Sequence, residues 1–198
     1  MKKIVLLAVI SLLGCGPVEE EIPFYKFDEV DFNFLPTIYE NLDAVRFKNE
    51  LGEEIILDVN LYRISKERVG GLSLGGNSSP LVDVNKFEIK LRLHGEECSF
   101  FYFYTYKGPH GVKSWFDISS YSCGGSTSYS TFNFEVPYPI SQLQIGNKTY
   151  EKVLIIEDAY STSESIIPYE INRFYFDLEY GIIGFDDSES NINFRIVN

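Results

Sequence analysis

Few residues of this chain have the types and spacing that acid–base or nucleophilic catalysis requires. The two histidines, His94 and His110, stand beside no GxSxG or HExxH motif. Adjacent carboxylates such as Asp186 and Asp187 could act as acid and base if the fold set them about 5–9 Å apart. Because the chain has 29 acidic residues, however, such pairs arise by chance. The sequence therefore predicts a protein that is not an enzyme, with a carboxylate-based hydrolase as the alternative.

The cysteines could form a disulfide or bind a metal ion. Cys98 and Cys123 lie beside strand-like segments, and in an oxidising compartment they could form a disulfide. Their spacing in the sequence does not establish how close their Cα atoms come, so paired and unpaired thiols both stay open. With no CxxC spacing and only two histidines in the chain, they form no recognisable zinc site. We therefore expect no metal and no cofactor.

An aromatic segment, residues 98–106, offers binding chemistry instead. Side chains of a strand alternate between its two faces, so Phe101 and Phe103 share one face while tyrosines share the other. If the phenylalanines face the core, the tyrosine rings and hydroxyls are suited to contact sugars or peptide side chains. Cross-strand aromatic packing is the alternative reading. The possible binding face comprises Tyr102, Tyr104, Tyr106 and Trp115.

The elements that position these residues are predicted to be strands. Apolar and polar residues alternate over many short segments, and none carries the apolar pattern of an amphipathic helix over three turns. We expect roughly nine to eleven strands, joined by polar turns, and at most one short helix. The predicted strands lie at 45–49, 55–62, 87–94, 98–106, 114–119, 131–136, 152–157, 172–178, 181–185 and 192–197. The glycine-rich stretch 70–77 is expected to be a loop between strands. The predicted fold is a single all-β domain, with an antiparallel sheet arranged as a sandwich or as an open, curved half-barrel.

The first fifteen residues predict where the protein works. Two lysines precede an apolar run, residues 4–13, which is too short to span a bilayer as a helix and has the features of a signal peptide. Gly14 then stands directly before Cys15. This arrangement resembles the bacterial lipobox, in which the cysteine thiol receives a diacylglyceryl group and the peptide bond before it is cut. The resemblance implies that residues 1–14 are a lipoprotein signal peptide and that Cys15 is lipidated and anchors the protein to a membrane.

The rest of the chain divides into a tether and a domain. Residues 15–36 are expected to form the lipidated N-terminus and an acidic tether, and residues 37–198 the antiparallel β-domain. Glu19, Glu20 and Glu21 follow the cysteine closely, which is similar to the export signal of surface lipoproteins in Bacteroidota. Segment 180–185, Tyr-Gly-Ile-Ile-Gly-Phe, resembles the closing strands of small uncharacterised Bacteroidota lipoproteins. The resemblance implies an outer-membrane protein of the cell envelope, facing the periplasm or the cell surface, with no assigned activity.

Net charge limits the partners. The formal charge is −12, and loss of residues 1–14 removes two lysines and no acid, which makes it −14. Such a chain repels the phosphates of nucleic acids and does not favour docking on anionic lipid through a basic patch. We therefore predict a lipid-anchored, non-enzymatic β-domain that binds a glycan, a peptide or a protein, or that serves envelope assembly. A lipid-carrying half-barrel is a further alternative, and the sequence does not indicate the oligomeric state.

Overall fold

The computed structural model of the chain describes residues 21–72, 78–96, 99–121, 127–135, 137–157, 171–187 and 191–197. These ranges contain twelve strands and two short 3-10 helices. The strands are β1 (Phe24–Tyr25), β2 (Ala44–Lys48), β3 (Glu54–Leu72), β4 (Ser78–Leu93), β5 (Ser99–Gly108), β6 (Gly111–Tyr121), β7 (Thr127–Glu135), β8 (Ile140–Ile145), β9 (Lys148–Ile156), β10 (Ile171–Asp177), β11 (Gly181–Asp187) and β12 (Ile192–Ile196). The helices are η1 (Asp31–Phe34) and η2 (Thr37–Asn41). No helix in the described ranges is long and apolar enough to cross a membrane.

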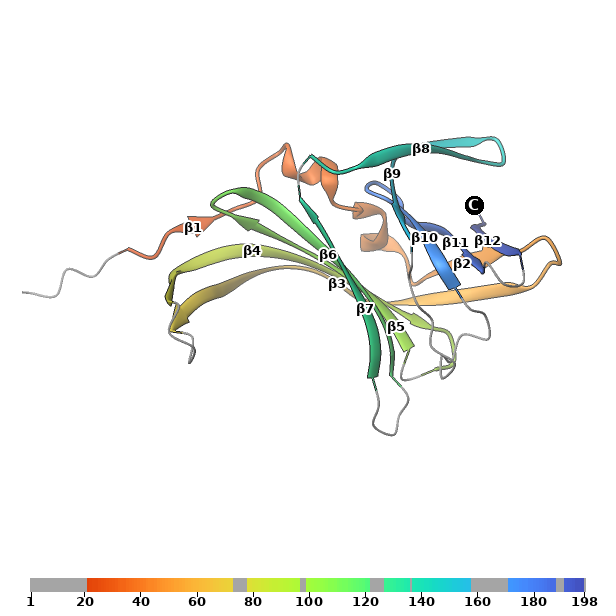
Figure 1. Ribbon diagram of the computed structural model, residues 1–198, viewed down its shortest axis with the longest axis horizontal. Coiled ribbons are helices and arrows are strands. Elements are labelled where there is room, and N and C mark those ends of the chain that lie inside the picture. Colours follow the sequence, from red (N-terminus) through yellow and green to blue (C-terminus); the bar gives the residue numbers. More distant parts are fainter. Residues whose placement is uncertain are drawn as a thin grey trace, which may run out of the picture.

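All twelve strands belong to one sheet, which confirms the all-β prediction (Figure 1). Eleven of them follow the order β7-β6-β5-β4-β3-β2-β12-β11-β10-β9-β8, and every neighbouring pair on this path is antiparallel. β1 lies off the path and pairs in parallel with β4, where Phe24 stands opposite Asp83. The last strand, β12, is inserted between β2 and β11. It therefore connects the block of strands β2–β7 with the block β8–β11 in one sheet.

The sheet curls because the strands of its two halves, β2–β7 and β8–β12, carry apolar side chains on the same face, and curling brings these side chains into contact. Side chains of β5 meet those of β10 across the interior, with ring centroids 5.2 Å apart for Phe101 and Phe174 and 4.4 Å apart for Phe103 and Phe176. We call this the inner face and the opposite one the outer face. Of the two arrangements expected from the sequence, the open, curved half-barrel is therefore the one that forms.

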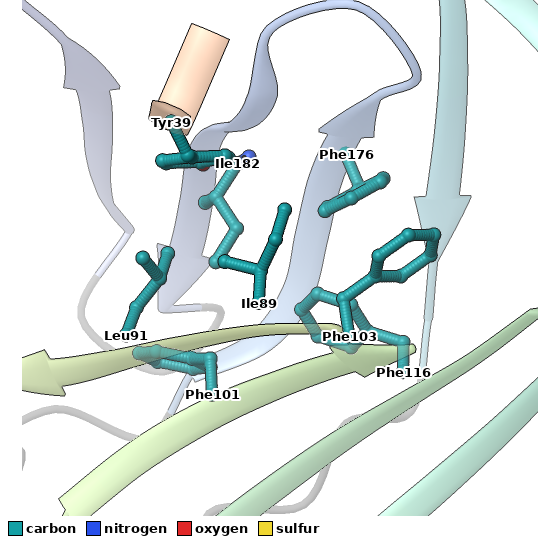
Figure 2. Close-up of a pocket in the computed structure, with 8 residues that line it drawn as sticks. All are labelled: Tyr39, Ile89, Leu91, Phe101, Phe103, Phe116, Phe176 and Ile182. Carbon is teal, nitrogen blue, oxygen red and sulfur yellow. Dashed lines mark hydrogen bonds between the residues drawn. The ribbon is translucent and has the colours of Figure 1, made fainter. Parts of the chain in front are cut away.

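Aromatic and aliphatic side chains fill the interior. Figure 2 shows side chains of β4, β5 and β6 pointing toward η2, β10 and β11. They leave a cavity of about 10 Å³ lined by Tyr39, Ile89, Leu91, Phe101, Phe103, Phe116, Phe176 and Ile182. A space of that size and apolar lining stays dry. The Tyr39 hydroxyl accepts a hydrogen bond from the Ile182 N–H at 2.8 Å, and burial raises the pKa of this phenol.

Regular structure extends beyond the strands that alternation predicts. β1 and η1 fall within residues 15–36, the segment expected to be a tether, and β8 has no counterpart among the predicted strands. β3 continues to Leu72, well past the predicted end at residue 62 and into the glycine-rich stretch expected to be a loop. Gly70 has φ +91° there, and a Cβ at this position would lie 2.2 Å from the Pro80 carbonyl oxygen, so only glycine fits this bulge.

Candidate binding face

The predicted cysteine sites lie outside the described residues. This applies to the lipidation site Cys15 and to the possible disulfide between Cys98 and Cys123. Lipidation and the disulfide both stay predictions. The remaining predicted site residues, those of the possible binding face, are all described.

The tyrosines lie on the outer face of the sheet, opposite the core. Alternation along β5 buries Phe101 and Phe103 on the inner face and leaves Tyr102, Tyr104 and Tyr106 half-buried on the outer one. The antiparallel register of β5 and β6 then places Trp115 directly across from Tyr104. The structure therefore brings all four predicted residues together, and we call Tyr102, Tyr104, Tyr106 and Trp115 the aromatic face.

The rings of the aromatic face pack closely against one another. Tyr104 and Trp115 are nearly parallel, with centroids 5.2 Å apart and an interplanar angle of 7°. Tyr102 stacks on Tyr104 with centroids 4.7 Å apart, and Tyr106 meets Trp115 edge to face at 5.5 Å. Such contacts restrain each ring in one orientation, so the surface is preorganised.

A charged network supports the rings from β4 and β3. The Glu88 side chain is only 4% exposed, and its carboxylate accepts hydrogen bonds from the Tyr102 hydroxyl and the Arg63 guanidinium. The Lys86 ammonium lies 3.0 Å from the Glu88 carboxylate and 5.2–5.8 Å from the centroids of three tyrosine rings. Pairing to opposite charge and to ring faces offsets the cost of burying these two charges.

Glu88 and Lys86 are both ionised at neutral pH. Burial alone would raise the pKa of Glu88, but hydrogen bonds from Tyr102, Arg63 and Lys86 outweigh it and hold this pKa at about 2. Burial would lower the pKa of Lys86, yet its hydrogen bonds with Glu88 and two tyrosines raise that pKa above its ordinary value. Burial and the bond to Glu88 raise the pKa of Tyr102. The carboxylate is therefore a permanent acceptor and cannot donate a proton to a substrate near pH 7.

Two polar groups of the aromatic face are left for a ligand. The Tyr102 hydroxyl donates to Glu88, and the Tyr106 hydroxyl donates to Glu67 at 3.3 Å. By contrast, the hydroxyl of Tyr104 and the indole N–H of Trp115 make no hydrogen bond to another described residue. The centre of the face thus combines apolar ring surface with one hydroxyl and one N–H donor.

The sequence analysis did not predict the charged network around Glu88, although the alternation of residues and a turn could have indicated it. Glu88 alternates with apolar residues in the predicted strand 87–94, which places it on the polar face of that strand. A turn at Gly95 follows this strand, and the antiparallel register of β4 and β5 places Glu88 opposite Tyr104. A register derived from the turn would therefore have placed a carboxylate beside the tyrosines.

The other candidate catalytic groups are held in separate surroundings. His94 lies on the surface with Nδ1 3.0 Å from Asp58 Oδ1, and His110 is exposed in the turn between β5 and β6. Asp186 accepts a hydrogen bond from Tyr175 at 2.6 Å and pairs with Arg195 at 2.5 Å. Across the described part of the chain, no group of three or more His, Cys, Asp or Glu side chains is placed to hold a metal ion.

Comparisons of the chain with protein-family models, with curated protein sequences and with solved structures found no match. The assignment of a function therefore depends on the geometry of the aromatic face and on the chain's own sequence.

Proposed function

We propose that the protein is a cell-envelope lipoprotein whose β-domain binds a glycan on the aromatic face. The observation that carries the proposal is the pairing of Tyr104 with Trp115. Their rings are held nearly parallel on an outer sheet face, while the hydroxyl and the indole N–H make no hydrogen bond within the described ranges. Aromatic rings contact the C–H groups of sugars, and the two polar groups can bond to sugar hydroxyls.

The charged network favours binding over hydrolysis at this face. A glycosidase needs one carboxyl group that is protonated at working pH and a second one nearby. The pKa of Glu88 lies at about 2, so it cannot be the acid of such a pair, and its bonds to Tyr102, Arg63 and Lys86 occupy the oxygens that a base or nucleophile would need. The role that fits Glu88 is to fix the position of Tyr102 and Lys86 beneath a ligand.

The filled interior is an argument against transport of a lipid. A lipid-carrying half-barrel needs a continuous apolar space of several hundred cubic ångströms, since ligand pockets are commonly about 300–1,000 Å³. Among the described residues, the core cavity next to Tyr39 is about 10 Å³, and side chains of η2 and β11 close it from the side opposite β4 (Figure 2). An outer-face site is therefore the better-supported location for a ligand.

The aromatic face is testable through the chain's only tryptophan, because Trp115 lies within it. We expect an array of neutral and acidic oligosaccharides to yield a ligand that changes Trp115 fluorescence. Replacing Tyr104 by alanine should weaken binding of that oligosaccharide at least about 10-fold, which corresponds to about 1.4 kcal/mol. Replacing Tyr104 by phenylalanine should cost about 3–10-fold, because it removes one hydrogen bond and keeps the ring.

The matched control is Tyr25→Ala, since Tyr25 is also a half-buried strand tyrosine but lies on β1. Circular dichroism would verify that each variant is folded. Equal affinities for Tyr104→Ala and Tyr25→Ala would contradict the proposal. A response to a peptide pool but to none of the oligosaccharides would reassign the face to peptide recognition.

The envelope location is tested separately with Cys15→Ala. Lipidation of the thiol would give the protein at least two acyl chains, and two chains make anchoring stable where one is marginal. In cell fractionation, we expect the natural chain in the membrane fraction and the Cys15→Ala chain in the soluble fraction. Globomycin, which blocks processing of lipobox signals, should cause the unprocessed form of the natural chain to accumulate. Unchanged membrane association of the variant would refute the anchor.

A further inference from the structure

A second site is indicated on the outer face of the sheet at the β2–β12 pair. Lys48 on β2 and Arg195 on β12 stand directly opposite each other in this antiparallel pair, and their neighbours Phe47 and Phe194 face the core. Side chains that are directly opposite lie about 4.5–5.5 Å apart at Cβ, and like charges in this position destabilise a sheet. The cost of two facing cations therefore depends on how far each one is balanced by a carboxylate.

A third cation approaches the pair from the β8–β9 hairpin. The hairpin turn, Gly146-Asn147, brings Lys148 to the same place, and together these elements border a cleft of about 530 Å³. The cleft is shallow and largely open to solvent. The cleft is lined by Lys48, Asn49, Ile145, Gly146, Asn147, Lys148, Arg195, Ile196 and Val197. All three charged residues of the lining are positive.

The three cations differ in how far their charge is already balanced. Arg195 pairs with Asp186 at 2.5 Å, so its charge is largely compensated. Lys48 lies 3.8 Å from a Glu54 oxygen, and both side chains are nearly half exposed, so this pair is weak. No carboxylate in the described ranges pairs with Lys148.

Aromatic rings hold Lys148 in position. Its ammonium lies 3.3 Å from the ring centroid of Tyr180 and 4.8 Å from that of Tyr150. The ring of Tyr150 is buried, so one wall of this cage is rigid. Such cation–π contacts orient an ammonium without neutralising it. The Lys148 ammonium is therefore held at the rim of the cleft by aromatic rings and not by a carboxylate.

We propose that this cleft binds an oxyanion, a carboxylate or phosphate group carried by a small ligand. The ammonium groups of Lys48 and Lys148 contact the anion, and the side-chain amide of Asn147 supplies a further donor. Ile145, Ile196 and Val197 contact the uncharged part of the ligand. An anion bound here adds to the weak compensation that Lys48 receives from Glu54.

The test is a titration of the full-length ¹⁵N-labelled protein with sodium phosphate and, separately, with sodium glucuronate, at constant ionic strength. We expect both to shift the amide signals of Gly146, Asn147 and Lys148, while neutral glucose leaves them unchanged. Lys148→Gln should weaken binding of the stronger probe at least fivefold, and Lys48→Gln should do the same. Glucuronate binding more tightly than phosphate would identify an acidic sugar as the source of the oxyanion, and the reverse would identify a phosphorylated ligand.

The matched control is Lys26→Gln, which removes an exposed lysine on the distant N-terminal segment. If Lys26→Gln and Lys148→Gln weaken phosphate binding equally, or if chloride produces the same shifts, the proposal is overturned. A thermal melt verifies that the variants stay folded, because Lys48→Gln loses only a weak pair with Glu54 and should leave Tm nearly unchanged. These signals are independent of Trp115 fluorescence, so the outcome does not depend on the aromatic face.

Discussion

Replacing Gly181 by alanine is expected to lower the free energy of unfolding by about 3 kcal/mol or more. Gly181 has φ +69°, which costs an L-residue about 1–2 kcal/mol. A Cβ at this position would also lie 2.1 Å from the ring of Tyr39. Overpacking a core typically costs about 1–3 kcal/mol, which adds to the backbone strain. For a chain of this size, Tm should fall by about 10 °C, measurable by circular dichroism.

The matched control is Gly146→Ala. Gly146 has nearly the same dihedral, φ +60°, but a Cβ there would meet no atom within 4 Å. It should therefore cost only the backbone strain, about 1 kcal/mol. The difference between the two variants isolates the contact with Tyr39. Combining Gly181→Ala with Tyr39→Leu should give less than the sum of the single losses, because the shorter side chain removes the clash. Equal Tm values for the two alanine variants would contradict this account of Gly181.

The second large effect is expected for Glu88→Gln, which should cost about 2–3 kcal/mol. The neutral amide leaves the nearly buried ammonium of Lys86 without its closest carboxylate. Breaking a fully buried pair costs about 3–5 kcal/mol, and the smaller value reflects that Arg63 reaches solvent. Urea unfolding at pH 7 would measure the loss in free energy of unfolding for Glu88→Gln. The control is Glu135→Gln, because Glu135 pairs with Lys113 in an exposed bridge and should contribute less than about 1 kcal/mol.

Glu88→Gln also tests how the stability of the protein depends on pH. The pKa of Glu88 is about 2 in the folded protein, below its ordinary value of 4.5. A lowered carboxyl pKa contributes stability that is present above pH 4.5 and is lost as the pH falls toward 2. The stability difference between the natural chain and Glu88→Gln should therefore shrink over this interval. A difference that stays constant from pH 5 to pH 2 would show that the charge of Glu88 is not what stabilises the network. Replacing both residues, Lys86→Met with Glu88→Leu, should restore much of the loss, since no buried charge is then left unpaired.

The sequence predicted the strands that have one wet and one dry face, and it missed those that do not. Residues 55–62 and 87–94 alternate clearly, and they form the parts of β3 and β4 that cover the core. The continuation of β3 from Arg63 to Arg68 carries charged side chains and little apolar surface. Its strand structure depends on backbone pairing to β4, which alternation cannot reveal.

The positions of the tyrosines in the candidate site could be predicted from the sequence, but the charged residues beside them could not. Alternation placed Tyr102, Tyr104 and Tyr106 on one face of a strand, which needs only the two-residue period. The approach of Trp115 and Glu88 depends on the register between strands, and register is set by turns and by tertiary packing. The cleft at Lys48 was beyond sequence reasoning, because its partner in the sheet is about 150 residues away.

The insertion of β12 between β2 and β11 also makes the fold depend on strand pairing between distant parts of the chain. Without residues 192–196, the sheet separates into two blocks, one from β7 to β2 and one from β11 to β8. Each block would expose an unpaired edge, and the inner faces that meet in the core would lack their closing strand. The core therefore closes only when β12 has paired on both sides, and the pairing of Lys48 with Arg195 closes a loop of about 150 residues, which is the kind of long-range contact that slows folding.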